Sequence, residues 1–325
     1  MTSKPVPMAP AGVGAPSGSR LADRVFHLLC LAGALTVGLL LLLVLWELIK
    51  GSHLSMKTFG WKFFISKTWD PNAGVDGAYG ALPFIYGTIV TSIIALVIAV
   101  PLSIGTAIYL TDLAPMWLRQ PLTSIIEMLA AVPSVIWGLW GIFVLVPVLR
   151  TDVYPVLQKI LGFLPFFKGP ILGVGLLTAG TIVAIMILPI VTSVSREVLR
   201  SVPNLQREAA YALGATRWEV TRIAVLSYAR RGLMGAAVLG LGRALGETMA
   251  VTMVIGNAPN ISLSLFDSGD TLASVIANQF PEASGVMLSS LFELGLVLLG
   301  VTILVNILAQ IMIHALTTAE TRRVA

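Results

Sequence analysis

Charged residues are scarce in this chain of 325 residues: Asp, Glu, Lys and Arg make up 11% of it, whereas hydrophobic residues make up 56%. Soluble globular domains carry about 25% charged residues, and the mean hydropathy of +0.90 agrees with this deficit. Cys30 is the only cysteine, which excludes a disulfide within the chain and Cys-rich metal or redox motifs. Three scattered histidines, His27, His53 and His314, lack the spacing of metal ligands. The composition therefore predicts a protein whose solvent is lipid.

The sequence also lacks a nucleotide-binding loop of the form Gly-x-x-x-x-Gly-Lys-Ser/Thr. Its Lys-Thr pairs, Lys57-Thr58 and Lys67-Thr68, follow Met56 and Ser66 instead of glycine. No stretch between the apolar segments is long enough to form a separate soluble catalytic domain. We therefore expect a subunit that is not an enzyme and binds no cofactor, with any ATP hydrolysis carried out by a partner.

Long apolar runs are what the sequence has in abundance. A membrane-spanning helix needs about 20 apolar residues, and six segments reach that length: 25–49, 84–110, 121–149, 171–191, 231–255 and 288–315. We predict an all-α membrane protein with one transmembrane domain over residues 25–325. Residues 1–24 are rich in Pro, Gly, Ala and Ser, and we expect them to form a disordered tail.

The basic residues are distributed unevenly between the two sides of these spans. With the N-terminus inside, the inner segments hold thirteen Lys and Arg residues and the outer segments hold seven. The outer loop 256–287 carries Asp267, Asp270 and Glu282 but neither Lys nor Arg. This asymmetry predicts that both termini are cytoplasmic, and it explains the net charge of +5 better than nucleic-acid binding does.

An aromatic segment follows the first span. Residues 53–86 alternate aromatic and polar side chains and include several lysines; the first aromatic residues are Phe59, Trp61, Phe63, Phe64 and Trp69. Such a composition predicts a helix that lies in the headgroup region. Contact with an extracytoplasmic partner is the alternative.

Two short helices are expected between the fourth and fifth apolar segments. Ser201 is a candidate N-cap, Pro203 suits a first turn, and Gly214 can end a helix in the left-handed conformation. The first helix is thus predicted over about 203–214. Thr216 and Glu219 have the spacing of a capping box, which predicts the start of a second helix.

The first of these helices has a slim profile and one apolar face. Leu205, Ala209 and Leu213 share this face because they are four residues apart. Such a helix fits a groove on another protein, or it rests on the bilayer, where the seven arginines around it would meet lipid phosphates. The spacing alone favours neither. The residues predicted to make the contact are Glu208, Ala209, Ala210, Leu213, Gly214 and Ala215.

Two charged residues lie within the fifth apolar segment. Arg243 follows Arg231 by twelve residues, or roughly 18 Å of helix, which places it near the middle of a ~30 Å hydrocarbon core. Glu247 is four residues further on. An Arg at that depth costs about 2.5–3.5 kcal/mol, so it usually faces a cavity or the bundle interior. The pair either lines a path for an anion, with Glu247 offsetting the attraction, or packs between helices as a neutral unit.

Other polar or helix-breaking positions lie in the third and last apolar segments. Pro133-Ser134, close to Gly138 and Gly141, either lines the path or acts as a hinge, or it serves ordinary helix packing. Glu127 and Glu293 are expected at the interface or bonded to neighbouring helices.

The short helix carries a more specific signal. Glu208-Ala209-Ala210 followed by Gly214 resembles the EAA-x-x-x-G signature of binding-protein-dependent ABC importer permeases. Four further segments are similar to the C-type permease subunits of phosphate-specific ABC importers: Tyr79–Phe84, Ile98–Gly105, Ala131–Val135 and Leu241–Thr248. The resemblance covers about residues 20–325. One departure is Leu226-Ser227, where the family has Leu-Pro.

This resemblance implies a six-helix type I permease bundle in the bacterial cytoplasmic membrane, with residues 203–214 as the coupling helix. It implies a heterodimer with a second related permease, two ATPase subunits that hold ATP and magnesium, and an extracytoplasmic phosphate-binding protein. The chain would then import inorganic phosphate. An importer of another oxyanion, sulfate or molybdate, and a secondary anion transporter are the alternatives.

Overall fold

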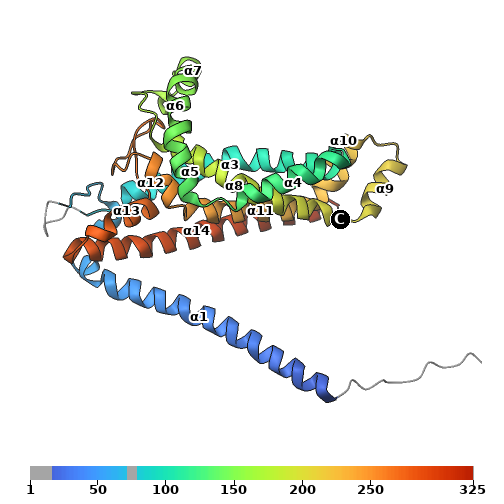
Figure 1. The fold of residues 1–325 in the computed structure, drawn as a ribbon, viewed down its shortest axis with the longest axis horizontal. Helices are drawn as coiled ribbons and strands as arrows, with labels where there is room; N and C mark the ends of the chain where they lie inside the picture. The colour runs from blue at the N-terminus through green and yellow to red at the C-terminus, as the bar shows by residue number, and fades with distance from the viewer. Residues whose placement is uncertain (1–16, 72–78, 325) are drawn as a thin grey trace, which may run out of the picture. The chain divides into compact units, whose positions relative to one another are not determined.

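The computed structural model describes residues 17–71 and 79–324, with side chains over 22–71 and 79–314, and these residues contain helices but no strand (Figure 1). The N-terminal half contains α1 (Ser17–Phe59), α2 (Lys62–Ile65), α3 (Leu82–Ile108) with its π-helical extension η1 (Tyr109–Leu113), α4 (Met116–Ala130), and a nearly continuous run of α5 (Ser134–Trp140), η2 (Gly141–Leu145), α6 (Val146–Val148), η3 (Leu149–Val153) and α7 (Tyr154–Leu161).

The C-terminal half begins with the short turn η4 (Pro165–Phe167). It continues with α8 (Leu176–Arg200), α9 (Asn204–Ala212), α10 (Arg217–Glu219), η5 (Val220–Val225), α11 (Leu226–Leu245), α12 (Met249–Val254), α13 (Leu272–Gln279), η6 (Phe280–Glu282) and α14 (Gly285–Val324). The chain divides into two units, residues 1–50 and residues 51–325. Among the described residues, the first unit contains α1 up to Lys50, and the second contains the end of α1 and all the other helices.

Five helices in the described ranges are long and apolar enough to cross a membrane: Ala22–Phe59, Leu82–Leu113, Ser134–Leu161, Leu176–Arg200 and Gly285–His314. They overlap five of the six apolar segments seen in the sequence. The predicted tail 1–24 is helical from Ser17 onward, and residues 1–16 lie outside the described part of the chain.

Two predicted segments are not single helices. The segment 121–149 is divided at Ala131–Pro133, because Pro133 has an extended backbone (ψ 142°) and α5 begins after it. The segment 231–255 is divided at Gly246–Thr248, between α11 and α12. The expectation of one continuous helix in each segment is therefore corrected. Pro101 and Pro189, by contrast, lie inside the unbroken helices α3 and α8.

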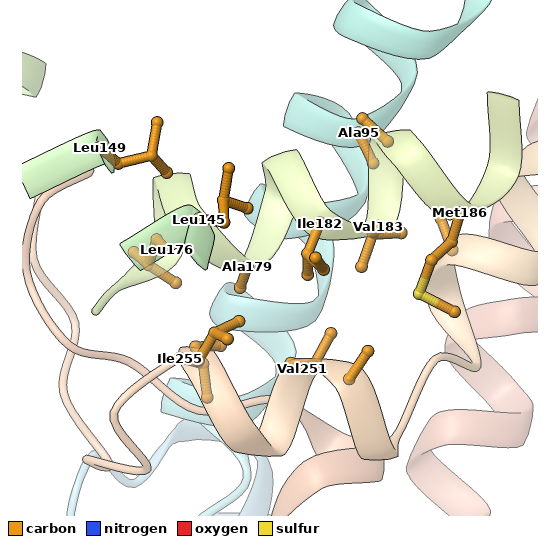
Figure 2. Close-up of a cluster of buried hydrophobic side chains, with 14 of the residues drawn as sticks. Ala95, Leu145, Leu149, Leu176, Ala179, Ile182, Val183, Met186, Val251 and Ile255 are labelled. Carbon is orange, nitrogen blue, oxygen red and sulfur yellow. The ribbon is translucent and has the colours of Figure 1, made fainter. Parts of the chain in front are cut away.

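Helix α8 is the most buried of the candidate spans and packs along α3. Small residues make the close approach possible, as is usual for helices in lipid. A Cβ on Gly180 of α8 would lie 2.5 Å from Cγ2 of Ile94 on α3. Figure 2 shows the main core: Ile182 and Val183 of α8 meet Ala95 on one side and Val251 of α12 on the other. This core holds α12 in place after the break in residues 246–248.

The aromatic segment after the first span divides between core and surface. Phe63 is fully buried and Trp69 is 7% exposed, and both pack with Phe84 in a second core cluster. Trp69 donates a hydrogen bond from Nε1 to Oε1 of Gln279 at 2.8 Å. Trp61, in contrast, is 81% exposed. The expectation that these rings are all interfacial is corrected, since composition cannot distinguish a ring in the core from a ring at the membrane surface.

The loop between α12 and α13 folds back onto the start of α8. Leu176 and Leu177 donate their backbone N–H groups to the carbonyl oxygens of Asp267 and Leu265. These are N-terminal amides of α8 that have no partner inside the helix. The loop is thus an integral part of the bundle, and its irregular backbone is satisfied by the helix it covers.

Asp270 lies at the end of this loop and is only 2% exposed. Its Oδ1 accepts hydrogen bonds from the Thr271 N–H at 2.8 Å and from Oγ of Ser274 at 2.5 Å. Burial outweighs these two bonds and raises the pKa of Asp270 from 3.8 to about 6. The folded state therefore favours the protonated carboxyl group.

A raised carboxyl pKa makes the protein more stable in acid. The contribution of Asp270 to the free energy of unfolding is fully present below about pH 4 and is lost as the pH rises through about 6. The loss amounts to about 3 kcal/mol at most. Asp270→Asn keeps an oxygen acceptor without the charge, so this variant should gain thermal stability over the wild type at pH 7.5 and little at pH 4.5. If the difference in melting temperature between the two proteins were the same at pH 4.5 and pH 7.5, the raised pKa of Asp270 would be contradicted.

Candidate translocation site and coupling helix

A cavity of about 570 Å³ lies between α8, α11 and α14. Most of its wall comes from one face of α11, where two glycines keep the surface open; the lining residues are Ile190, Gly235, Val238, Leu239, Gly242, Arg243 and Asn306. Arg243 is the only charged residue in this set. The lining of the cavity is therefore apolar except for the guanidinium of Arg243 and the amide of Asn306.

Arg243 pairs with Glu247 as the sequence spacing predicts, with 3.3 Å between Nη2 and Oε2. The two side chains differ sharply in exposure: Glu247 is 3% exposed and Arg243 is 47% exposed. Because α11 ends at Leu245, Glu247 lies in the break before α12, where the chain turns the carboxylate into the bundle. A packed neutral pair would bury both partners. Here the carboxylate is buried behind a guanidinium that keeps half of its surface open.

Asn306 was missed by the sequence analysis. It lies on α14 and faces the same cavity as Arg243. The signal was present, because Thr302, Asn306 and Gln310 recur every four residues in an otherwise apolar stretch. An amide offers two N–H donors as well as an acceptor, so it complements a guanidinium in binding oxygen atoms.

Pro133 and Ser134 are not among the residues that line this cavity. Pro133 is the N-cap of α5, and α5 packs against α12. The approach is close at Gly138, where a Cβ would lie 3.1 Å from Cα of Ala250. The break at Ala131–Pro133 thus sets the direction of α5. Helix α5 in turn supports α12, the helix that follows Glu247 in the chain.

Glu127 and Glu293 bond to neighbouring helices, as expected. Glu127 of α4 pairs with Arg196 of α8 at 3.1 Å, and Arg196 also donates to Oγ1 of Thr123. Glu293 of α14 accepts a 2.5 Å hydrogen bond from Oγ of Ser55 in α1. Both carboxylates are interhelical ties away from the Arg243 cavity.

The coupling-helix candidate is α9, Asn204–Ala212, inside the predicted range 203–214. Its N-cap is Pro203, which corrects the assignment of Ser201. Helix α8 runs on to Arg200, so Ser201 is its C-cap, and the Ser201 hydroxyl donates to the carbonyl oxygen of Val198. Gly214 has the predicted left-handed backbone, with φ of +83°.

The short helix that follows begins with the predicted capping box. The Thr216 N–H donates to Oε2 of Glu219 at 2.7 Å, and the Glu219 N–H donates to Oγ1 of Thr216 at 3.4 Å. The backbone hydrogen bond from Thr216 lowers the pKa of the Glu219 carboxyl group. From there η5 passes into α11 without interruption, so the helix continues through Leu226-Ser227.

Helix α9 has no buried residue: Leu205 is 72% exposed, and Leu213, the C-cap that follows the helix, is 89% exposed. Polar contacts of Arg207 join the helix to the bundle. Arg207 pairs with Asp112 of η1 at 2.6 Å and also donates to the carbonyl oxygen of Leu199 at 3.1 Å. Arg207 thus joins α9 to η1, at the end of α3, and to the end of α8. Arg207 and Asp112 are 95 positions apart in the sequence, so no local sequence pattern predicts their contact.

Comparison with known proteins identifies the family to which the chain is similar. The profile of the family described as "Binding-protein-dependent transport system inner membrane component" matches residues 99–318. The phosphate transport system permease protein PstC of Haemophilus influenzae is 51% identical over 86% of this chain and 89% of that protein. PstC of Xylella fastidiosa (strain Temecula1) is 45% identical over 96% of this chain and 98% of its own length. An inward-facing structure of the MetNI methionine ABC transporter aligns with a TM-score of 0.48 at 20% identity, over 73% of this chain and 94% of that one.

If the Arg243 cavity holds water, a cysteine in its wall should react with a water-soluble thiol reagent, because the reactive species is the thiolate. We expect Asn306→Cys, in a Cys30→Ser background, to be labelled in intact membranes. Leu304→Cys is the matched control on the same helix; Leu304 is 58% exposed in the isolated chain but lies outside this cavity. Labelling measured by mass shift should be at least about tenfold faster for Asn306→Cys. Equal rates would show that the cavity is dry.

Proposed function

We propose that this chain, which belongs to the family of inner membrane components of binding-protein-dependent transport systems, forms part of the membrane pathway of an ATP-driven phosphate importer. The relatives that match almost its whole length carry the name of phosphate transport permeases. Their substrate is a tetrahedral anion. The cavity at Arg243 offers the chemistry that such an anion needs.

The observation that carries this proposal is the unequal burial of Arg243 and Glu247. A guanidinium presents forked N–H donors that match two oxygens of a phosphate group. At an effective dielectric constant near 20, one charge at 4 Å contributes about 4 kcal/mol before desolvation. Glu247, 3.3 Å behind the guanidinium, reduces this attraction. The site thus selects an anion and still allows it to leave.

The transport cycle that we propose uses two pseudo-equivalent permease subunits, a heterodimer of this chain and a related one. Two ATPase subunits hold ATP and magnesium on the cytoplasmic side, where both termini lie, and an extracytoplasmic binding protein delivers phosphate. The ATPases bind the open apolar face of α9, where Leu205 and Leu213 stand exposed. Closure of the ATPases then moves α9 and, through Arg207 and Asp112, the ends of α3 and α8.

Another oxyanion is the second candidate, because a guanidinium with an amide suits sulfate or molybdate as well as phosphate. The discriminating measurement is which anion, delivered by the binding protein, stimulates ATP hydrolysis by the complex. Uptake that persists without ATP but requires a proton gradient would instead point to a secondary transporter.

Removal of the cavity charge tests the proposal directly. Arg243→Ala should lower ATP-driven phosphate uptake by at least about tenfold, since the anion loses its main electrostatic partner. The complex should still assemble, because half of the Arg243 side chain is open. Arg231→Ala, a charge removed from an exposed position on the same helix, is the matched control and should transport normally. Uptake at the wild-type rate by Arg243→Ala would remove the pair from the mechanism.

A second variant tests the coupling role of α9. Leu213→Asp should retain membrane insertion but lose ATP-driven uptake, because the charge would have to be buried in the apolar contact with the ATPase. Leu213→Met, which keeps the size and polarity, should transport like the wild type. Since Leu213 is 89% exposed, neither change disturbs the core. Full uptake by Leu213→Asp would place the ATPase contact elsewhere.

A further inference from the structure

A second cavity, of about 560 Å³, lies beside α9 at the cytoplasmic end of the bundle. Four segments enclose it: the turn η1, the first turn of α4, the helix α9, and the α10–η5 segment. The residues on which the argument rests are Thr111, Asp112, Arg119, Arg207 and Arg217. No part of this wall is shared with the Arg243 cavity. It is therefore a separate site that the transport path does not use.

The charges in this cavity do not balance. It contains the side chains of three arginines, Arg119, Arg207 and Arg217, and of one acidic residue, Asp112. Asp112 is already engaged, with 2.6 Å between its Oδ1 and Nη1 of Arg207, and it also accepts from Oγ1 of Thr221 at 3.2 Å. Two positive charges therefore remain for an anion.

Two polar atoms of the wall are buried and have no hydrogen-bond partner: Nε of Arg119 and Oγ1 of Thr111. The other contact of Arg119, from Nη2 to the carbonyl oxygen of Ala114, is long at 3.4 Å. A buried donor normally has a partner in the folded protein. The guanidinium of Arg119 therefore has no strong partner within the described part of the chain.

Helix α4 adds to the positive potential. Its N-cap, Pro115, and its first residue, Met116, line the cavity, and no side chain caps this end. The open amide groups at a helix N-terminus attract anions, and the helix dipole acts in the same direction. The arginines and this helix end thus both favour an anionic ligand.

We propose that this cavity binds a phosphoryl oxyanion at the cytoplasmic end of the bundle and thereby ties α9 to η1 and α4. Arg119 contributes from α4 and Arg217 from α10, while Arg207 of α9 stands beside them in its pair with Asp112. Occupancy stiffens the joint through which α9 passes force to the bundle. That the cavity faces the cytoplasm rests on the function proposed above, whereas the anion chemistry does not.

Two sources supply this chemistry: free inorganic phosphate and the headgroup of an anionic phospholipid. Met116 and Trp117, at the start of α4, are 81% and 75% exposed. Large apolar side chains in such a position suit the membrane surface. A headgroup is thus within reach of the same donors, and the experiment has to separate the two sources.

The test uses the assembled transport complex with Arg243→Ala in this chain, so that phosphate binding at the transport cavity does not obscure the second site. In nanodiscs of phosphatidylcholine alone, radiolabelled inorganic phosphate should bind this complex. The further change Arg119→Gln, and separately Arg217→Gln, should weaken that binding at least about tenfold. Arg222→Gln is the matched control, an arginine of the neighbouring η5 that does not line the cavity, and it should leave binding unchanged.

A second arm measures phospholipid by mass spectrometry after purification from membranes that contain phosphatidylglycerol. Retention of this lipid that is lost in Arg119→Gln and Arg217→Gln, but not in Arg222→Gln, supports the site with a headgroup as its ligand. If neither phosphate nor phosphatidylglycerol responds to either variant, the proposal is overturned. Because Arg217 is exposed, Arg217→Gln remains informative if Arg119→Gln misfolds. The readout is binding and not uptake, so its outcome is independent of whether Arg243 proves essential for transport.

Discussion

Lipid offers no hydrogen-bond partner to a charge or to an open peptide group, and this constraint explains most of the polar structure of the chain. The break after α11 leaves backbone groups outside a helix and carries the carboxylate of Glu247. Protein covers this region, because Glu247 is buried and α12 packs into the main core. The loop before α13 gives its carbonyl oxygens to the amides of α8. Arg243 departs from this pattern, because half of its side chain remains open to a cavity. Under the function proposed above, this open charge belongs to a hydrated path for the anion.

The end of the bundle that carries α9 differs, because ion pairs between charged side chains join its helices. Arg196 ties α4 to α8 through Glu127, and Arg207 ties α9 to η1 through Asp112. The second joint connects the exposed helix α9 to the ends of α3 and α8. Arg207 also lines the cavity proposed to bind an anion, so the two proposals, coupling and anion binding, share this residue.

Local sequence patterns predicted the local features of the fold. Apolar runs located five spans, the spacing of Thr216 and Glu219 predicted the capping box, and Gly214 predicted a left-handed helix end. The breaks within two segments were not predictable in the same way, because Pro101 lies inside an unbroken helix whereas Pro133 lies in the break between α4 and α5. Tertiary packing decides between these outcomes. The Arg207–Asp112 pair and the anion cavity depend on elements distant in sequence, and no pattern in either element alone reveals them.

The central claim is that Arg243 stands in the path of the transported anion. The most direct measurement is an electron cryomicroscopy structure of the assembled complex, trapped during turnover with phosphate. The claim predicts density for a tetrahedral anion within hydrogen-bond distance of the Arg243 guanidinium, in a continuous channel between the two permeases. A structure in which the Arg243 cavity is filled by lipid or by side chains of the second permease, with the anion elsewhere, would contradict it.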